Sequence, residues 1–187
     1  MDYWLGMDCG GTYLKAGFDD SSGREYGMSR QVMPVLSDHP GWAERDMDQL
    51  WQGCCQTIQK VLHQCGVAGH QVKGIGISAQ GKGLFMLDKQ HRPLGRAILS
   101  SDRRATQIVT QWQQEGIPQQ LYPITRQTLW TGHPVSLLRW VKQHQPERYS
   151  QIGSVMMGHD YLRFCLTGER GCEETNISES NLYRMAQ

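Results

Sequence analysis

The stretch Asp8–Lys15 constrains this chain most, because it places an acid, two glycines, a hydroxyl and an amine within eight residues. Strand-like apolar runs flank it, over Tyr3–Met7 before the glycines and over Leu14–Phe18 after them. The glycines therefore fall where two strands must turn, and the pattern predicts a β-hairpin. A helical phosphate loop or a dinucleotide-binding fingerprint needs glycines at other spacings ahead of a helix, and neither spacing occurs.

The side chains of this hairpin suit phosphate binding. Gly10 and Gly11 can take positive φ and let backbone N–H groups approach an anion without a Cβ in the way. Asp8 would hold a cation, Thr12 offers a hydroxyl to a phosphate oxygen or to metal-bound water, and Lys15 adds a compact positive charge. The alternative is an ordinary glycine turn beside a surface lysine, and these residues alone leave it open.

The composition argues against several classes of partner. The 187 residues have a formal net charge of +1, with 19 Lys and Arg scattered among 18 Asp and Glu, so we expect no nucleic-acid partner. No membrane span or export signal is evident, and we expect no membrane partner and a cytoplasmic location. The length suits one core or one domain of a larger enzyme, and a homodimer is left open.

The cysteines are expected to be reduced. The six residues form no Cys-x-x-Cys pair and no zinc-ligand spacing with histidine. Cys54 and Cys65 lie on the apolar stripe of an expected helix, where a free cysteine behaves as a small hydrophobic residue. No metal site is therefore expected from cysteine.

Hydrophobic periodicity predicts an α/β fold that opens with three antiparallel strands. The third of these strands is expected over Glu25–Leu36. Apolar residues at steps of three and four over Met47–Cys65 then predict an amphipathic helix, with Asp46 as its N-cap. The glycine-interrupted run Val72–Ser78 suits a buried parallel strand that follows this helix.

Polar side chains follow that parallel strand at its carboxyl end, where open α/β sheets bind ligands. Gln80 and Lys82 are the candidates, because strand alternation would point both to one face. An exposed turn tip is the alternative for Lys82. In the loop before the helix, Trp42 either closes a sheet edge or has a functional role. The remaining elements are expected as strands over 84–87, 97–99 and 155–157, helices from 101, over 135–141 and over 160–166, and loops over 121–134 and 173–181.

Several segments agree in order and spacing with a known family. They are Leu5–Thr12, Gly41–Asp46, Gly74–Gly81, Ile98–Ala105 and Asp160–Glu169. Together they resemble the FGGY carbohydrate kinases over essentially the whole chain. The resemblance implies an actin-like, ribonuclease-H-like ATPase domain, whose mixed sheet has helices on both faces. It also implies transfer of the γ-phosphate of ATP to a sugar hydroxyl with Mg²⁺.

Carried over by residue, the resemblance assigns Asp8 to the acid near magnesium. It assigns Gly10, Gly11 and Thr12 to the phosphate turn. Lys15 matches a basic position that is arginine in some relatives. The hairpin would therefore face the phosphates of ATP.

The family's sugar-binding segment matches Gln80, Gly81 and Lys82. D-xylulose kinases have Met-His where this chain has Gly81 and Lys82, so the resemblance implies another ketose, such as L-xylulose or 3-keto-L-gulonate. The carboxylate of a keto acid would gain a charge-assisted contact with Lys82. Asp102 falls at a position that often has aspartate beside the sugar, and Arg103 follows it in the expected substrate site.

Relatives in this family have two domains, with the general base at the end of the first and the adenine pocket in the second. The resemblance places both beyond Gln187, so we expect residues 1–187 to be an incomplete N-terminal kinase domain that is inactive alone. Asp160 matches a structural segment and is disfavoured as a substitute base. A non-catalytic sugar-binding module is the alternative. Ser100 and Leu137 depart from the tryptophan and lysine that are frequent in the family.

Overall fold

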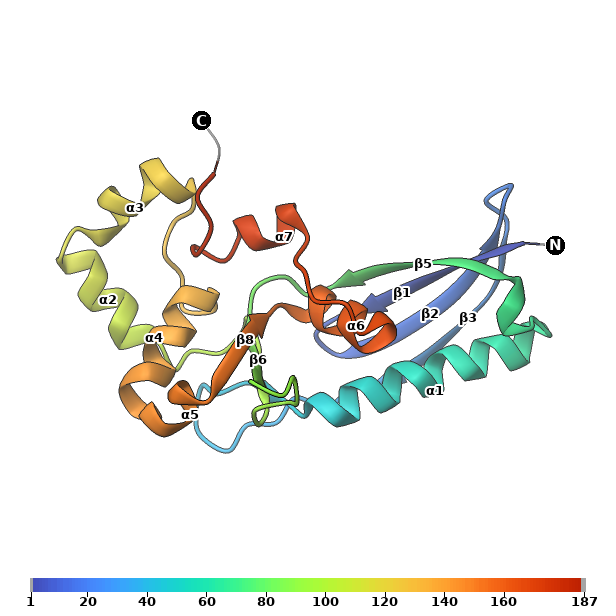
Figure 1. Cartoon of the computed structure of the whole chain (residues 1–187), viewed down its shortest axis with the longest axis horizontal. Helices are drawn as coiled ribbons and strands as arrows, with labels where there is room; N and C mark the ends of the chain where they lie inside the picture. The colour runs from blue at the N-terminus through green and yellow to red at the C-terminus, as the bar shows by residue number, and fades with distance from the viewer. Residues whose placement is uncertain (1, 186–187) are drawn as a thin grey trace. The chain divides into compact units, whose positions relative to one another are not determined.

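The computed structural model describes residues 2–185 and divides into two compact units. Unit 1 comprises Met1–Val35 and Asp48–Gln80, and unit 2 comprises Leu36–Met47 and Gly81–Gln187. Figure 1 shows the elements of both units along the chain. The opening hairpin belongs to unit 1, whereas most of the helices belong to unit 2.

Unit 1 is built on a four-stranded mixed sheet with the order β3-β2-β1-β5. Its strands are β1 (Tyr3–Cys9), β2 (Tyr13–Asp20), β3 (Glu25–Val32) and β5 (Val72–Ala79). The pairs β1–β2 and β2–β3 are antiparallel, and β5 runs parallel to β1. The three antiparallel strands and the parallel fourth are therefore as predicted, except that β3 ends at Val32 and not at Leu36.

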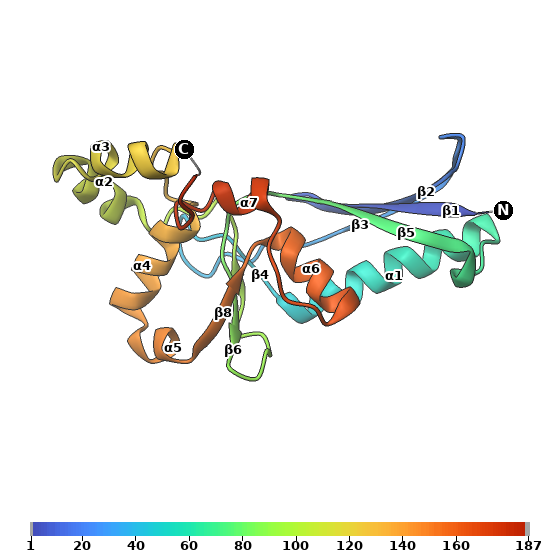
Figure 2. The ribbon, with the colours of Figure 1, turned by 45° about the horizontal axis from the view of Figure 1, so that its top comes forward.

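Side-chain alternation divides this sheet into two faces, and α1 (Met47–Cys65) packs against one of them. Leu5 and Phe18 lie opposite each other in the ladder and are both buried. At Gly53 of α1, a Cβ would lie only 3.1 Å from Leu14 and 2.5 Å from the Gln31 side chain. This glycine therefore lets the helix approach the sheet closely. Figures 1 and 2 show α1 running along the strands.

Unit 1 has no second α-helix among its described residues, and the opposite face of its sheet is exposed. On that face Trp4 is 50% exposed and Met28 56% exposed. The strand β5 is also open along most of its length, with Ile75 42% exposed. The prediction of a buried strand is therefore wrong, because β5 is an edge strand of this sheet, with β1 as its neighbour.

Unit 2 combines two short two-stranded sheets with several helices. The strands pair as β4 (Glu44–Arg45) with β7 (Ala97–Ile98) and β6 (Phe85–Asp88) with β8 (Ile152–Met156). The helices are α2 (Thr106–Gln114), α3 (Ile117–Thr125), α4 (Pro134–His144), α5 (Pro146–Ser150), α6 (Gly158–Thr167) and α7 (Glu174–Ser178), and unit 1 adds a 3₁₀ turn over Gly69–Gln71. The core of unit 2 contains Leu84, Met86, Ile98, Ala105, Leu137 and Val141.

Two helices of unit 2 lie where loops are predicted from the sequence. Gly116 takes positive φ, and Pro118 occupies the first turn of α3, where its missing N–H costs nothing. The short helix α7 is started by Glu173, whose carboxylate accepts hydrogen bonds from the amides of Thr175 and Asn176. Glycine, proline and polar residues therefore begin helices here, although the same residue types also mark loops.

A buried ion-pair network joins distant segments of unit 2. Arg104, whose side chain is fully buried, donates to Glu44 at 2.7 Å and to Asp102 at 2.9 Å. Asp102 also accepts the backbone amide of Ala43 at 2.6 Å. The guanidinium lies 3.8 Å from the ring centroid of Trp42, which gives that residue a structural contact.

We expect the substitution Arg104→Met to lower the free energy of unfolding by about 3 to 5 kcal/mol, because it leaves the buried Asp102 carboxylate without its cation. It also leaves Glu44 with only the longer contact to Arg96, at 3.4 Å. Urea unfolding of both proteins measures this difference. Arg92→Met is the matched control, since Arg92 is 73% exposed in its pair with Asp88, and should cost less than about 1 kcal/mol. Equal losses in both variants would contradict a dominant role for the buried network.

Candidate functional sites

The hairpin of unit 1 places Asp8 and Lys15 directly opposite each other on β1 and β2. The Lys15 ammonium donates to the Asp8 carboxylate at 3.2 Å, on the exposed face of the sheet. Both side chains remain more than two-fifths exposed, so the pair contributes little to stability. The pair instead presents a carboxylate and an ammonium group side by side, at the end of the ladder nearest the turn.

The glycines of this turn do not behave as predicted, because neither Gly10 nor Gly11 is among the residues with positive φ. A Cβ at Gly10 would lie 3.5 Å from the Tyr13 carbonyl, and one at Gly11 would lie 3.6 Å from the Gln80 side chain. Both distances are ordinary contacts, so the conformation and packing of the hairpin do not require glycine. The backbone amide of Gly10 donates to the Tyr13 carbonyl at 3.0 Å and so closes the turn, which differs from the expected free N–H group.

Gln80 lies beside this turn at the end of β5. Its backbone amide donates to the Cys9 carbonyl at 2.9 Å, which extends the β1–β5 ladder by one residue. Thr12 is exposed on the turn, and its carbonyl accepts the amide of Met33 at 2.8 Å. The structure therefore brings Gln80 together with the hairpin residues within unit 1.

The surroundings of Asp8 fit a weakly held Mg²⁺. No group of three or more His, Cys, Asp or Glu that could hold a metal occurs among residues 2–185. Mg²⁺ commonly keeps several waters and binds one or two carboxylates together with substrate phosphates. Asp8 lines a depression of about 610 Å³ together with Lys15 and Ser78. Its half-exposed carboxylate suits that mode of binding, provided that Lys15, which pairs with it at 3.2 Å, turns to the phosphates instead.

In unit 2, Lys82 forms an ion pair that the sequence did not predict. Its ammonium donates to the Glu179 carboxylate at 3.0 Å, and the two side chains are 25% and 40% exposed. The same nitrogen lies 5.8 Å from the ring centroid of Trp130. Lys82 has φ of 62°, which is uncommon outside glycine, so its backbone is held in a strained conformation.

Gly81 provides the space for this ion pair. A Cβ at Gly81 would lie 2.8 Å from the Glu179 Oε2 atom, which is closer than real contacts allow. A larger residue would therefore displace the carboxylate that pairs with Lys82. Glu179 itself was missed because it lies in a polar stretch predicted as a loop, and no local pattern marks it as a partner of Lys82.

His133 lies in the same unit and is held neutral. It is 2% exposed and its Nδ1 atom lies 2.8 Å from the Asn181 amide nitrogen. Asn181 also donates to the Thr128 carbonyl and accepts from the Thr125 hydroxyl, so its orientation is fixed and His133 Nδ1 is the acceptor. Burial, reinforced by the Lys82 charge, lowers the pKa of His133 to about 4, although Glu179 acts in the opposite direction.

The other expected substrate residues of unit 2 have different surroundings. Asp102 is fully buried, and both of its carboxylate oxygens accept hydrogen bonds from Arg104. Arg103 is exposed beside it and donates its backbone amide to the Gly41 carbonyl at 2.8 Å. Asp102 therefore belongs to the buried ion-pair network, whereas the side chain of Arg103 is exposed to solvent.

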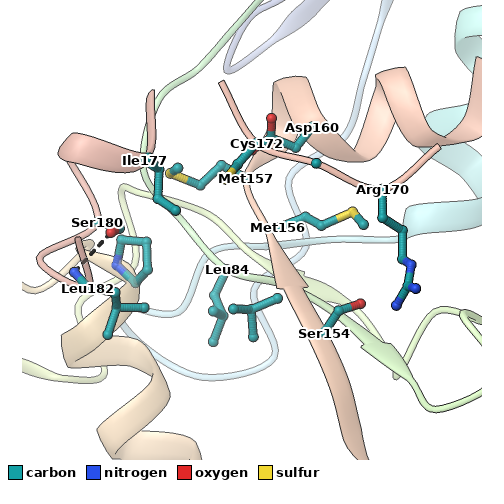
Figure 3. Close-up of a pocket in the computed structure, with 13 residues that line it drawn as sticks. Leu84, Ser154, Met156, Met157, Asp160, Arg170, Cys172, Ile177, Ser180 and Leu182 are labelled. Carbon is teal, nitrogen blue, oxygen red and sulfur yellow. Dashed lines mark hydrogen bonds between the residues drawn. The ribbon is translucent and has the colours of Figure 1, made fainter. Parts of the chain in front are cut away.

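An apolar pocket of about 330 Å³ in unit 2, shown in Figure 3, suits a sugar poorly. Leu84, Met156 and Leu182 are among its apolar lining residues, whereas a sugar needs many hydrogen-bonding groups. Asp160 lies at its edge, where burial raises the pKa of the carboxyl group. One Asp160 oxygen accepts the Glu173 amide at 3.1 Å, in keeping with a structural role.

The sequence matches the N-terminal domain of the FGGY family of carbohydrate kinases over residues 3–187. The chain belongs to this family. The sequence prediction of an FGGY kinase domain is thereby confirmed, and the actin-like ATPase fold with it.

Relatives within the FGGY family extend well beyond this chain. The chain is 68% identical over 184 residues to the L-xylulose/3-keto-L-gulonate kinase of Escherichia coli (strain K12). This alignment covers 98% of the chain and 37% of that protein. It is 60% identical over 185 residues to the probable L-xylulose kinase of Pasteurella multocida (strain Pm70), covering 99% of the chain and 38% of that protein. The chain thus spans less than two-fifths of the length of these relatives.

Solved structures show the same fold. The crystal structure of gluconate kinase from Lactobacillus acidophilus superposes with a TM-score of 0.92 at 24% identity, over 98% of this chain and 37% of that one.

Among the described residues, none of the helices has the length and apolar character needed to cross a bilayer.

We expect the neutral state of His133 to make folding sensitive to acid. With a folded pKa of about 4 and an unfolded value near 6.5, the unfolded chain binds the proton first as pH falls. Stability that is fully present above about pH 6.5 should therefore be lost progressively towards pH 4, by on the order of 2 to 3 kcal/mol. Urea unfolding at pH 7 and pH 4 measures this loss. The variant His133→Gln keeps an acceptor for Asn181 but has no group that binds this proton, so its loss of stability between pH 7 and pH 4 should be smaller by that amount. An equal loss in both proteins would contradict the role of His133.

Proposed function

We propose that the full-length protein containing this chain transfers the γ-phosphate of ATP to a hydroxyl group of a ketose such as L-xylulose or 3-keto-L-gulonate, with Mg²⁺. The 68% identity to a kinase of that name, across 98% of the chain, is the observation that supports this proposal most. The test is a coupled assay of ADP release with the full-length protein and each sugar. Lack of turnover with both sugars would overturn the proposed substrate class.

The hairpin of unit 1 has the groups that phosphoryl transfer requires on the nucleotide side. Bound Mg²⁺ would offset negative charge on the phosphate oxygens. Asp8 would hold the metal through its half-exposed carboxylate, and Lys15, which pairs with Asp8 in this structure, would place its ammonium beside the phosphates. Gly10 and Gly11 have no side chains that would keep the phosphates away from the turn, and Thr12 would offer its hydroxyl to them. The catalysis to which this chain contributes is therefore positioning and electrostatic stabilisation.

For the sugar we propose Gln80 at the end of unit 1 and, in unit 2, Gly81 and Lys82 with Arg103 as an exposed donor. The family resemblance also assigns Asp102 to the sugar, although both of its oxygens accept hydrogen bonds from Arg104 in this structure. We assign no residue of this chain as the general base. Asp160 is buried, and one of its carboxylate oxygens accepts a hydrogen bond from the Glu173 backbone amide. A base from the remainder of the full-length protein would accept the proton of the reacting hydroxyl.

We expect the isolated 187-residue chain to transfer no phosphate from ATP to a ketose, because the proposal places the base and the adenine pocket outside it. The measurement is ADP release by purified chain with Mg²⁺ and millimolar L-xylulose, compared with the full-length protein under the same conditions. Sugar-dependent turnover by the isolated chain above the no-enzyme rate would show that the assignment of the base is wrong.

In the full-length protein, Asp8→Asn should lower kcat by roughly 100-fold or more while changing the KM for the sugar little, because Asp8 acts through the metal. Steady-state kinetics at saturating ATP measures both constants. Asp19→Asn is the matched control, since Asp19 lies on the neighbouring strand and is exposed. If Asp8→Asn changed only the KM for the sugar, Asp8 would act on the sugar and its assignment to the metal would be wrong.

A further inference from the structure

Glu179 lies where it alters what Lys82 can bind. Lys82 is expected from the family resemblance to face the sugar, and a free ammonium there would favour a substrate carboxylate. In the structure the Glu179 carboxylate already occupies the position 3.0 Å from that ammonium. A second carboxylate at Lys82 would therefore lie beside the charge of Glu179, and like charges in such proximity repel.

The two charges of this pair cancel each other. Lys82 contributes a positive charge and Glu179 a negative one, and these are the charged groups that influence His133. His133 is uncharged, because the fixed Asn181 amide donates to its Nδ1 atom. A neutral ligand is therefore matched electrostatically to the cluster, whereas an anion is not.

Hydroxyl groups fit the ion pair in both of their hydrogen-bonding roles. A sugar hydroxyl can donate to the carboxylate of Glu179 and accept from the ammonium of Lys82. Both side chains are accessible, being 25% and 40% exposed, and Trp130 adds a ring that is 45% exposed. An aromatic face beside charged hydrogen-bonding groups suits the mixed apolar and polar surface of a sugar.

We propose that Glu179 is a substrate-binding residue which, paired with Lys82, selects a neutral ketose over a keto acid. The inference rests on the proposed function and deepens it by naming the substrate class. Gly81 is part of the same arrangement, because a Cβ there would displace the carboxylate. Glu179 thus binds hydroxyl groups and cancels the charge by which Lys82 would attract an acid.

The test compares kcat/KM for L-xylulose and 3-keto-L-gulonate in the full-length protein. Glu179→Gln removes the negative charge but keeps the shape of the side chain. It should raise the KM for L-xylulose about tenfold and shift the ratio of kcat/KM about tenfold or more towards the keto acid, as expected for loss of a charged hydrogen bond. Glu174→Gln, an equal charge change at an exposed residue nearby, should leave the ratio unchanged.

A second variant tests the same role of Glu179 independently, in case Glu179→Gln does not fold. Gly81→Ala displaces the Glu179 carboxylate without changing any charge, and Gly81 does not require positive φ. It should shift the substrate ratio in the same direction as Glu179→Gln, whereas Lys82→Met should shift it away from the keto acid. A purely structural role for Glu179 would lower activity on both sugars equally.

The outcomes separate this inference from the proposed function. An active wild-type protein whose ratio is unchanged in both Glu179→Gln and Gly81→Ala overturns the inference and leaves the kinase proposal standing. A wild-type protein inactive on both sugars removes the proposed function, and the inference with it. A shift towards the keto acid in either variant, with no shift in Glu174→Gln, supports the role of Glu179.

Discussion

The register between β1 and β2 decides where the chemistry of unit 1 lies. Leu5 is paired with Phe18 on the buried face, and Asp8 is paired with Lys15 on the exposed one. A slip of one residue would exchange the faces, burying the acid and the amine and exposing the apolar set. The apolar residues that pack under α1 therefore fix the position of the polar pair, and the hairpin needs no separate device to present it.

Much of unit 1 follows from local patterns in the sequence. Alternation of period two predicts the hairpin, and steps of three and four predict α1, because each pattern reports which face an element buries. Whether β5 is buried depends on what lies beyond it in the sheet, which its own sequence does not record. The conformations of Gly10 and Gly11 were likewise mispredicted, since the presence of glycine permits positive φ but does not require it.

Unit 2 was less predictable, because long-range pairs determine it. Lys82 and Glu179 are 97 residues apart in the sequence, and Arg104 and Glu44 are 60 apart. Composition gives no signal for such partners, since a charged residue in a polar stretch is usually solvated. The family resemblance located Lys82 and Asp102, but the structure shows that one is matched by Glu179 and the other is enclosed by Arg104. Their contacts with a sugar stay predictions.

The space left by Gly81 has an evolutionary consequence. Because a Cβ at this residue would lie 2.8 Å from the Glu179 Oε2 atom, a substitution at the first position moves the carboxylate at the second. A lineage that acquires a larger residue at position 81 would therefore weaken the pair between Lys82 and Glu179, although both of its members are still present. Positions 81, 82 and 179 should covary as a group among relatives for this reason.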